Sequence, residues 1–221
     1  MKSYIIAINE IKESRFSGID AKREARKFGI EPEIFNAITP ENSDVDDMLA
    51  KRRIPSAGFE ADAQYSRTQR CKAAFLSHMS IWEKCLKDRD GDPYLIMEHD
   101  ARVVLPVPEH MPIGANIVNL GKPSYGRYNT PTSLGFGPLV SKNYLPGAHG
   151  YMINAAGAFD LIERAKIDGG PTDTFIHNNR FPERIAEYYP WPIEVKETFT
   201  TIQHQGGIAA KHQVNENYEI I

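Results

Sequence analysis

Two carboxylates, Glu98 and Asp100, flank His99 in the stretch 94–104, YLIMEHDARVV. The run from Tyr94 to Met97 is apolar without a break, which is typical of a strand covered on both faces. Oxygen ligands at positions i and i+2 can converge on one hard cation, and strand ends of α/β sheets are where ligands bind. The pattern favours a metal-assisted phosphate or nucleotide-sugar site, and an ordinary strand with a solvated turn is the alternative.

The segments before this motif predict the opening of an α/β sheet. Strands are predicted at 3–8 and 32–37, and a charged helix at 19–28 lies between them and is ended by Gly29. The β-α-β order is typical of such a sheet. The polar segment 39–66 is predicted as a loop with a short helix.

The strongest helical pattern covers 68–86, which precedes a turn at 88–93. Its apolar residues recur at spacings of four, three and four, so they form one stripe on one face. The stripe consists of Phe75, Met79, Trp82 and Leu86.

The second half of the chain predicts strands at 116–120, 149–153 and 198–203 and a helix at 155–167 with Asn154 as a possible cap. The segment 121–146 between the first two strands is rich in Gly, Pro, Tyr, Ser and Thr. Long irregular segments of this kind are usually functional. We therefore expect a lid, whose aromatic residues Tyr125, Tyr128 and Phe136 would stack on sugar faces.

The composition is that of an ordinary globular protein, and we expect one domain over residues 1–221. A net charge of −3 gives no strong nucleic-acid signal. Two cysteines, Cys71 and Cys85, are too few for a disulfide framework, so a reducing, cytoplasmic location is expected. The sequence has no apolar stretch of membrane length, so no transmembrane segment is predicted.

Several pieces of the chain, in this order, resemble glycosyltransferase family 25, which contains lipooligosaccharide and collagen galactosyltransferases. The pieces are IIAIN at 5–9, FGIEPEIFNAI at 28–38, CKAAFLSHMSIWEKCL at 71–86, YLIMEHDARV at 94–103, NIVNLG at 116–121, GAHGYMINAAGAFDLI at 147–162 and PTDTFI at 171–176. The resemblance implies a GT-A fold, which is an α/β, Rossmann-like mixed sheet flanked by helices. It also implies a nucleoside diphosphate sugar as donor and Mn²⁺ or Mg²⁺ as cofactor.

The chain departs from the family pattern at the acidic motif, where EDD becomes EHD and His99 replaces the middle acid. His99 either turns toward the sheet or a neighbouring loop, or serves as an imidazole ligand that favours a transition metal. Ala73 and Ala74 replace a glycine and a cysteine before the LSH motif, and Asn116 replaces an acid.

The resemblance implies roles for the candidate metal ligands. Asp100 is expected to bind the cation directly, because the last acid of a GT-A motif has that role. Glu98 is expected to bind it through water or to contact the ribose. His204 is a candidate third ligand, by analogy with the fold alone.

Further residues are expected to bind the donor. Asn9, at the end of the first strand, lies where the base or ribose would rest. Ser77 and His78 are expected to donate hydrogen bonds to the diphosphate or to the acidic strand, and His78 as a structural residue is the alternative. His149 and Tyr151 contact the donor sugar or the acceptor, or are buried in the sheet.

Asp173 is the candidate general base. The family resemblance implies inversion at the sugar carbon, and such a displacement needs a base that takes the proton of the acceptor hydroxyl. A helix cap or a sugar-hydroxyl contact is the alternative role for this residue.

The sequence thus predicts a metal-dependent glycosyltransferase, a hexosyltransferase that moves galactose or a related hexose from a UDP-sugar. Its acceptor would be a hydroxyl of a glycan, such as one made in lipopolysaccharide biosynthesis, of a protein or of another molecule. A non-catalytic nucleotide-sugar-binding module and a nucleotidyltransferase-like enzyme are the alternatives, and the second lacks a GxxxxGK[ST] loop.

Overall fold

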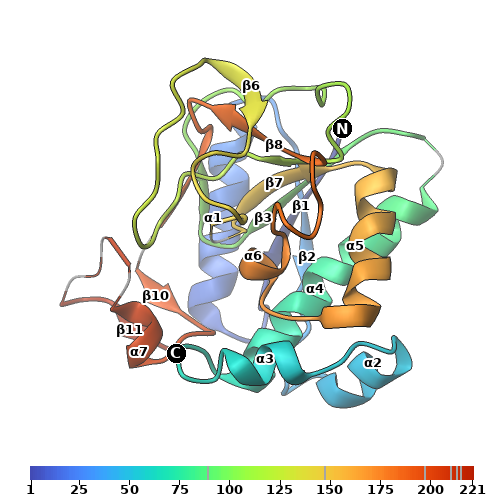
Figure 1. Ribbon diagram of the computed structural model, residues 1–221. Coiled ribbons are helices and arrows are strands. Elements are labelled where there is room, and N and C mark those ends of the chain that lie inside the picture. Colours follow the sequence, from blue (N-terminus) through green and yellow to red (C-terminus); the bar gives the residue numbers. More distant parts are fainter. Residues whose placement is uncertain (89, 147, 197, 210, 213, 215) are drawn as a thin grey trace.

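The computed structural model describes residues 1–88, 90–146, 148–196, 198–209, 211–212, 214 and 216–221. Within these ranges seven strands form one mixed sheet in the order β2-β1-β3-β7-β5-β8-β6 (Figure 1). The strands are β1 Lys2–Ala7, β2 Glu33–Asn36, β3 Tyr94–Glu98, β5 Ile117–Asn119, β6 Gly135–Pro138, β7 Gly150–Ile153 and β8 Ile185–Tyr189. The predicted α/β, Rossmann-like class is therefore confirmed.

The strand directions bring several chain segments to one edge of the sheet. β1 pairs in parallel with both β2 and β3, so these three strands end at the same edge. β7 runs antiparallel to β3 and to β5, so β7 begins at that edge and β5 ends there. The residues that follow β3 and β5 and those that precede β7 are therefore neighbours.

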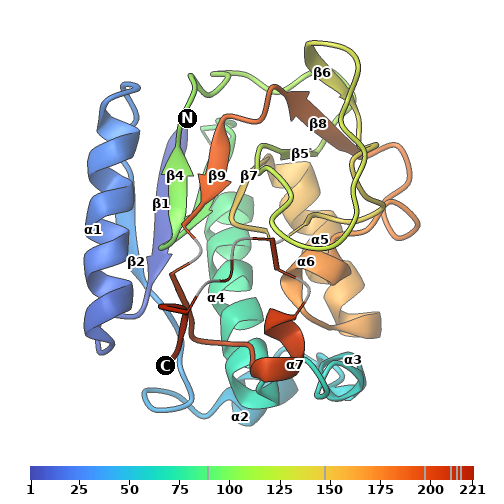
Figure 2. The same cartoon turned by 90° about the vertical axis from the view of Figure 1, so that its left-hand side faces the viewer.

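Helices cover both faces of the sheet (Figure 2). One face carries α4 and α5, and the other carries α1 together with a two-stranded ribbon of β4 and β9. The helices are α1 Lys12–Arg26, α2 Val45–Lys51, α3 Ala57–Ala61, α4 Thr68–Lys87, α5 Ala155–Asp168, α6 Thr172–Phe175 and α7 Gln205–Ile208. The remaining strands are β4 Ala101–Val103, β9 Ile193–Val195, β10 Phe199–Thr200 and β11 Glu219–Ile220.

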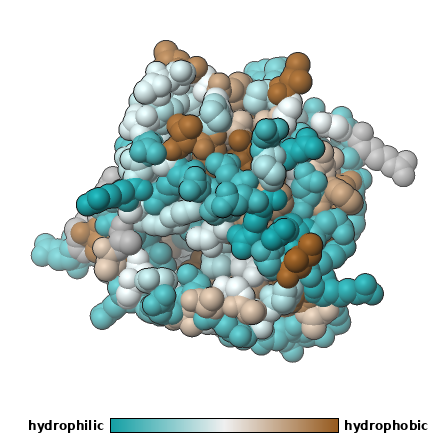
Figure 3. All heavy atoms as spheres, in the orientation of Figure 1, coloured by the Kyte–Doolittle hydropathy of each residue, from teal (hydrophilic) through white to brown (hydrophobic). Residues whose placement is uncertain are grey.

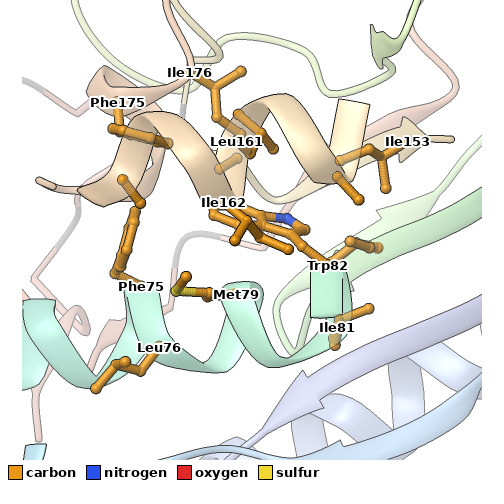
Figure 4. Packing of buried hydrophobic residues seen from close by; sticks show 14 of the residues in the cluster. Phe75, Leu76, Met79, Ile81, Trp82, Ile153, Leu161, Ile162, Phe175 and Ile176 are labelled. Atoms are coloured by element: carbon orange, nitrogen blue, oxygen red, sulfur yellow. The ribbon is translucent and has the colours of Figure 1, made fainter. Parts of the chain in front are cut away.

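The larger part of the core lies between α4, α5 and the sheet. Figure 4 shows Phe75 and Trp82 of α4 among Leu161 and Ile162 of α5 and Phe175 of α6. Phe75 meets Trp82 and Phe175 edge to face, with ring centroids 5.5 and 5.2 Å apart. The predicted stripe is thus buried as far as Trp82. Leu86, its last member, is 40% exposed because α4 ends one residue later.

Helix α1 begins at Lys12, seven residues before the predicted start at 19. It faces the sheet with small residues, Ser14, Gly18, Ala21 and Ala25. A Cβ on Gly18 would lie 3.0 Å from the Cβ of Ala7, so the helix backbone lies close to β1. The sequence pattern missed this start because the buried stripe carries no large apolar side chain.

Three other expectations need correction. The polar segment 39–66 holds two helices, α2 and α3, and the Asp44 side chain caps α2 by accepting a hydrogen bond from Asp47 N. The segment 121–146, expected to be irregular, contributes β6, and the sheet includes β8, which no pattern predicted. The strand expected at 198–203 is the two-residue β10. The Asn154 cap of α5 is confirmed by its bond from Gly157 N.

The molecular surface is mainly polar on the face shown in Figure 3, with apolar side chains scattered over it. No helix in the described ranges combines the length and the apolar character that crossing a bilayer requires. Cys71 and Cys85 are both buried and free.

We predict that Phe75→Ala lowers the free energy of unfolding by about 3–5 kcal/mol, because it leaves a cavity among three aromatic rings. Urea denaturation followed by circular dichroism measures the change. Phe159→Ala on α5, where the side chain is 52% exposed, is the matched control and should change stability by less than about 0.5 kcal/mol. Equal effects of the two variants would contradict this packing.

Candidate active site

A cavity of about 420 Å³, the main cavity, opens at the edge of the sheet where β3 and β5 end and β7 begins. The acidic turn after β3 lines it, together with His149 before β7 and residues of α6. A small cavity of about 50 Å³ adjoins it at the ends of β1 and β2, and Glu98 and His99 line both cavities. The predicted acidic motif therefore lies where these two cavities adjoin.

Asp100 follows β3 and lines the main cavity. Its carboxylate oxygen Oδ1 is buried and has no hydrogen-bond partner among the described residues. Its backbone carbonyl accepts a hydrogen bond of 2.8 Å from Lys196 N, which fixes the turn against the end of β9. A buried carboxylate oxygen without a partner is costly in an apolar setting, and a cation would satisfy it.

Glu98 is connected to the core by a chain of hydrogen bonds. Trp82 Nε1 lies 2.7 Å from the hydroxyl of Tyr151, which lies 3.0 Å from His78 Nδ1. His78 Nε2 lies 3.1 Å from Glu98 Oε1. Because an ionised carboxylate only accepts, His78 donates to Glu98 from Nε2. In the neutral imidazole Nδ1 then accepts the proton of the Tyr151 hydroxyl, which in turn accepts from Trp82 Nε1.

The hydrogen-bond chain also sets the charge of Glu98. Burial alone would raise the pKa of Glu98, but the hydrogen bond that His78 donates to its carboxylate outweighs burial. The pKa of Glu98 therefore lies below its ordinary value. Glu98 is ionised at neutral pH, as a cation-binding or ribose-binding carboxylate must be.

His149 lines the main cavity and is buried. Burial lowers the pKa of His149 although Asp100 and Glu98 raise it, so the imidazole is neutral at physiological pH. Its Nε2 has no partner in the described part of the chain. A Cβ on Gly121 would lie 2.6 Å from this atom, so the absence of a side chain at Gly121 makes room for the ring.

His99 turns toward a neighbouring segment of the chain. Its ring stacks on Phe199 of β10, with centroids 5.2 Å apart and planes 5° apart. The His99 carbonyl accepts a hydrogen bond of 2.9 Å from Ser17 Oγ on α1. Of the two options left open by the sequence, the geometry favours contact with a neighbouring segment.

The expected donor-binding residues divide into two groups. Glu98, His78 and Ser77 line the small cavity, but the Ser77 hydroxyl already donates to the Ala73 carbonyl and accepts from Ile38 N. Tyr151 is fully buried and lines neither cavity. Its hydroxyl is hydrogen-bonded to His78 and Trp82 in the core.

Asn9 lies outside both cavities. It is exposed beyond the end of β1, and its backbone N–H donates to the Asn36 side chain. Its neighbour Ile8 lines the small cavity instead.

Asp173 lies on α6 and lines the main cavity opposite the acidic turn. Its Oδ2 accepts a hydrogen bond of 2.5 Å from the Tyr125 hydroxyl, and its Oδ1 accepts one from Thr174 N. Burial raises the pKa of Asp173 above its ordinary value, and the charges of Glu98 and Asp62 add to this, although both hydrogen bonds lower it. A carboxylate with a raised pKa is a better proton acceptor.

His204 is not brought to the acidic turn. Its Nδ1 caps α7 by accepting a hydrogen bond from Gly206 N, and its Nε2 lies 2.8 Å from the carbonyl of Ala63, so both ring nitrogens are engaged. His204 also lines neither cavity. His204 is the N-cap of α7, Gln205–Ile208, and this placement does not support the expected role as a metal ligand.

Of the three aromatic residues expected to stack on sugars, Tyr125 lines the main cavity, and so does Tyr144 of the same segment. Tyr128 packs edge to face on Trp191, and Phe136 packs on Tyr188 of β8. The two rings are thus held by the segments around β8 and β9.

Sequence reasoning missed Asp62, Thr201 and Gln203 as residues of the main cavity. Asp62 follows α3 and lies close enough to Asp173 to raise its pKa. No spacing or motif connects these positions with the acidic strand. Only the folding of the segments around α3 and β10 over the edge of the sheet brings them there.

The residues at the acidic turn could supply only some of the ligands of a divalent cation. No group of three or more His, Cys, Asp or Glu side chains in the described ranges is arranged to hold a metal ion. Asp100 nevertheless offers a buried carboxylate oxygen that lacks a partner there, at a cavity also lined by neutral His149. Such a site needs oxygen ligands from elsewhere, and phosphate oxygens commonly complete Mg²⁺ and Mn²⁺ sites.

We predict that Tyr151→Phe lowers the free energy of unfolding by about 1–3 kcal/mol, because Trp82 Nε1–H then loses its buried acceptor. Chemical denaturation of both proteins measures the difference. Tyr65→Phe is the control, since Tyr65 is 48% exposed and the change should cost less than about 0.5 kcal/mol. If Tyr151→Phe left the free energy of unfolding unchanged, the hydrogen-bond chain would not be required for stability.

We predict that Asp173→Asn stabilises the fold at pH 7 and that the gain disappears as the pH is lowered. The pKa of Asp173 is raised in the folded state above its unfolded value of about 3.9. Its contribution to stability is therefore complete below the unfolded pKa and is lost as the pH rises through the folded pKa. Urea denaturation at pH values between 3 and 8, about one pH unit apart, measures the difference in the free energy of unfolding between the two proteins.

Asp20→Asn on α1 is the control for this pH series, because Asp20 is partly exposed to solvent and forms an ion pair with Arg23 on the same helix. Its effect should stay below about 0.5 kcal/mol throughout. If Asp173→Asn were instead destabilising at pH 7, the bonds from Tyr125 and Thr174 would outweigh the burial of the charge.

The comparisons with known proteins agree with the geometry of the site. Residues 1–106 match the family model described as glycosyltransferase family 25 (LPS biosynthesis protein). The match runs from β1 through β4 and so includes His78, Glu98 and Asp100, but it ends before His149 and Asp173. No curated protein matches the chain. The resemblance is therefore confirmed over residues 1–106, where the chain is similar to the glycosyltransferases of family 25.

Proposed function

We propose that this enzyme transfers a hexose from a UDP-sugar to a hydroxyl group of a glycan, with inversion and with the help of a divalent cation. The observation that carries the proposal is the buried, unpartnered Oδ1 of Asp100 among the described residues, at the edge of a sheet and next to an ionised Glu98. A family described as acting in LPS biosynthesis supports a glycan as the acceptor. The main cavity, about 420 Å³, lies in the usual range of ligand pockets, roughly 300–1,000 Å³.

The base of the nucleoside is proposed to lie against the small cavity, which at about 50 Å³ is too small to enclose the whole nucleoside. Its wall is formed by Ile6, Ile8 and Ile38, which offer an apolar surface to a flat base. Arg70 and Thr39 lie at the same cavity and offer polar groups to the ribose or phosphate. Because Glu98 and His99 line both cavities, a donor that extends from one to the other passes the acidic turn.

Asp100 is the proposed direct ligand of the cation, and Glu98 contacts it through water or binds the ribose. A divalent cation supplies Lewis-acid stabilisation of the negative charge that develops on the leaving diphosphate. Neutral His149 can contribute a nitrogen ligand or a hydrogen bond to the donor without adding charge.

Asp173 is the proposed general base. It accepts the proton of the acceptor hydroxyl while that oxygen attacks the anomeric carbon of the sugar. The bond from this carbon to the diphosphate breaks in the same step, so the configuration inverts. Tyr125, which donates to Oδ2, orients the carboxylate and leaves one face of Asp173 toward the main cavity.

The proposal is tested by donor hydrolysis, which needs no assumption about the acceptor. The purified chain is incubated with UDP-galactose, UDP-glucose, UDP-N-acetyl sugars and GDP-mannose, each with Mn²⁺, Mg²⁺ or EDTA. We expect release of UDP from one donor and loss of this activity with EDTA. Asp100→Asn should lower the rate by about two orders of magnitude or more, because several kcal/mol of charge stabilisation are lost.

Asp92→Asn, in the exposed turn before β3, is the matched control and should leave the rate unchanged. Asp173→Asn should retain UDP binding, as measured by calorimetry, but slow release by roughly 10²–10⁴-fold, as expected for the loss of a general base. Full activity of Asp100→Asn would exclude the assigned cation ligand. Absence of both nucleotide release and UDP binding would contradict the proposed reaction.

A further inference from the structure

A third cavity, the basic cavity, adjoins the main cavity and has no role in the reaction described so far. Its volume is about 560 Å³, and its charged or aromatic wall residues are Arg102, Lys122, Lys196, His212, Glu194 and Tyr128. Ser124 and Val195 line both this cavity and the main cavity. A molecule that enters the main cavity can therefore extend into the basic cavity.

The charge in this cavity is unbalanced. Glu194 is the only carboxylate among the described residues that line it, and Glu194 already pairs with Lys122 at 3.1 Å. Arg102 and Lys196 form no hydrogen bond or ion pair through their side chains with the described part of the chain. Two cations thus remain available to a ligand.

Lys196 is the less exposed of these two cations. It is only partly exposed and lines the basic cavity. A partly desolvated ammonium group without an ion-pair partner gains more from an anion than an ammonium group in open water does. The cavity is therefore suited to a negatively charged group.

The ribbon of β4 and β9 fixes this cavity relative to the reacting atoms. Arg102 pairs with Glu194 in register across the ribbon, and Lys196 N donates to the carbonyl of Asp100. The backbone of Lys196 is thus hydrogen-bonded directly to the acidic turn. Tyr128, held by Trp191, adds an aromatic ring of the kind that packs against sugars.

We propose that the basic cavity binds an anionic group, a phosphate or a carboxylate, that the acceptor glycan carries. The inference rests on the proposed function, because it assigns the acceptor side of the same site. The donor diphosphate is a poor candidate, since Glu98, His99 and Asp100 line the main cavity and none of them lines the basic cavity. The enzyme therefore selects acidic acceptors over neutral ones.

Calorimetric titration of the full chain tests this with four probes, namely glucose, glucose 6-phosphate, glucuronate and inorganic phosphate. Each titration is done with and without UDP and Mn²⁺. We expect at least one acidic sugar to bind about tenfold more tightly than glucose and than inorganic phosphate, because charge-assisted hydrogen bonds are added to the sugar contacts. Comparison of the two acidic sugars separates phosphate from carboxylate recognition.

Lys196→Gln and Arg102→Gln should each lower this preference by about tenfold. Lys87→Gln, in the exposed last turn of α4, is the matched control and should retain it. UDP affinity, measured in the same variants, should remain within about twofold of that of the unmodified chain.

Three results would overturn the proposal. They are an equal affinity for glucose and the acidic sugars, inorganic phosphate binding as tightly as the acidic sugars, and a loss of UDP affinity in Lys196→Gln. The third would assign these cations to the donor diphosphate. If the chain bound no UDP and released no nucleotide but kept a Lys196-dependent preference for an acidic sugar, the proposed transfer would fail and the anion site would stand.

Discussion

The position of Glu98 depends on hydrogen bonds that begin in the hydrophobic core. Trp82 and His78 are on α4, and Tyr151 is on β7, so the chain of bonds joins a helix and two neighbouring strands at one point. Each donor in it has an acceptor, and a fully satisfied buried network specifies one arrangement of its members. The edge of the sheet therefore presents Glu98 in one orientation, and the acidic turn that follows it is fixed as well.

Close packing supports the same edge of the sheet from other sides. A Cβ on Gly157 would lie 2.4 Å from the Asn116 carbonyl, which lets α5 begin directly against the end of β7 and the start of β5. Gly121 leaves space for the ring of His149 in a similar way. At both positions glycine is needed because a side chain would clash with a neighbour, not because the backbone angles are unusual. The site depends on the close packing of α5 against Asn116 and of the His149 ring against Gly121.

The electrostatics of the site follow from burial. Carboxylates and imidazoles alternate along the edge, so that Glu98 is kept ionised while burial favours neutral His149 and raises the pKa of Asp173. Groups that differ in this way can divide the work of holding a cation, contacting a sugar and accepting a proton. The neighbouring basic cavity, which shares Ser124 and Val195 with the main cavity, adds positive charge beside these carboxylates.

The sequence by itself determined the elements whose signals are local. The apolar run before Glu98, the stripe from Phe75 to Trp82 and the cap at Asn154 depend on residues a few positions apart, and the structure has each of them. The start of α1 was missed because its buried residues are small. The strand β8 was missed because its segment, IAEYY, carries a weak alternation of apolar and polar residues.

Only the tertiary structure decided which distant residues share the site. Asn9 and His204 carry suitable side chains, yet one lies beyond the strand end and the other caps α7. Tyr151 belongs to a matching motif, but its side chain points into the core, whereas Asp62 and Lys196 belong to no motif and line cavities. The reason is that local spacing fixes the period of a helix or strand, while strand order and the folding of the connections fix which faces and ends meet.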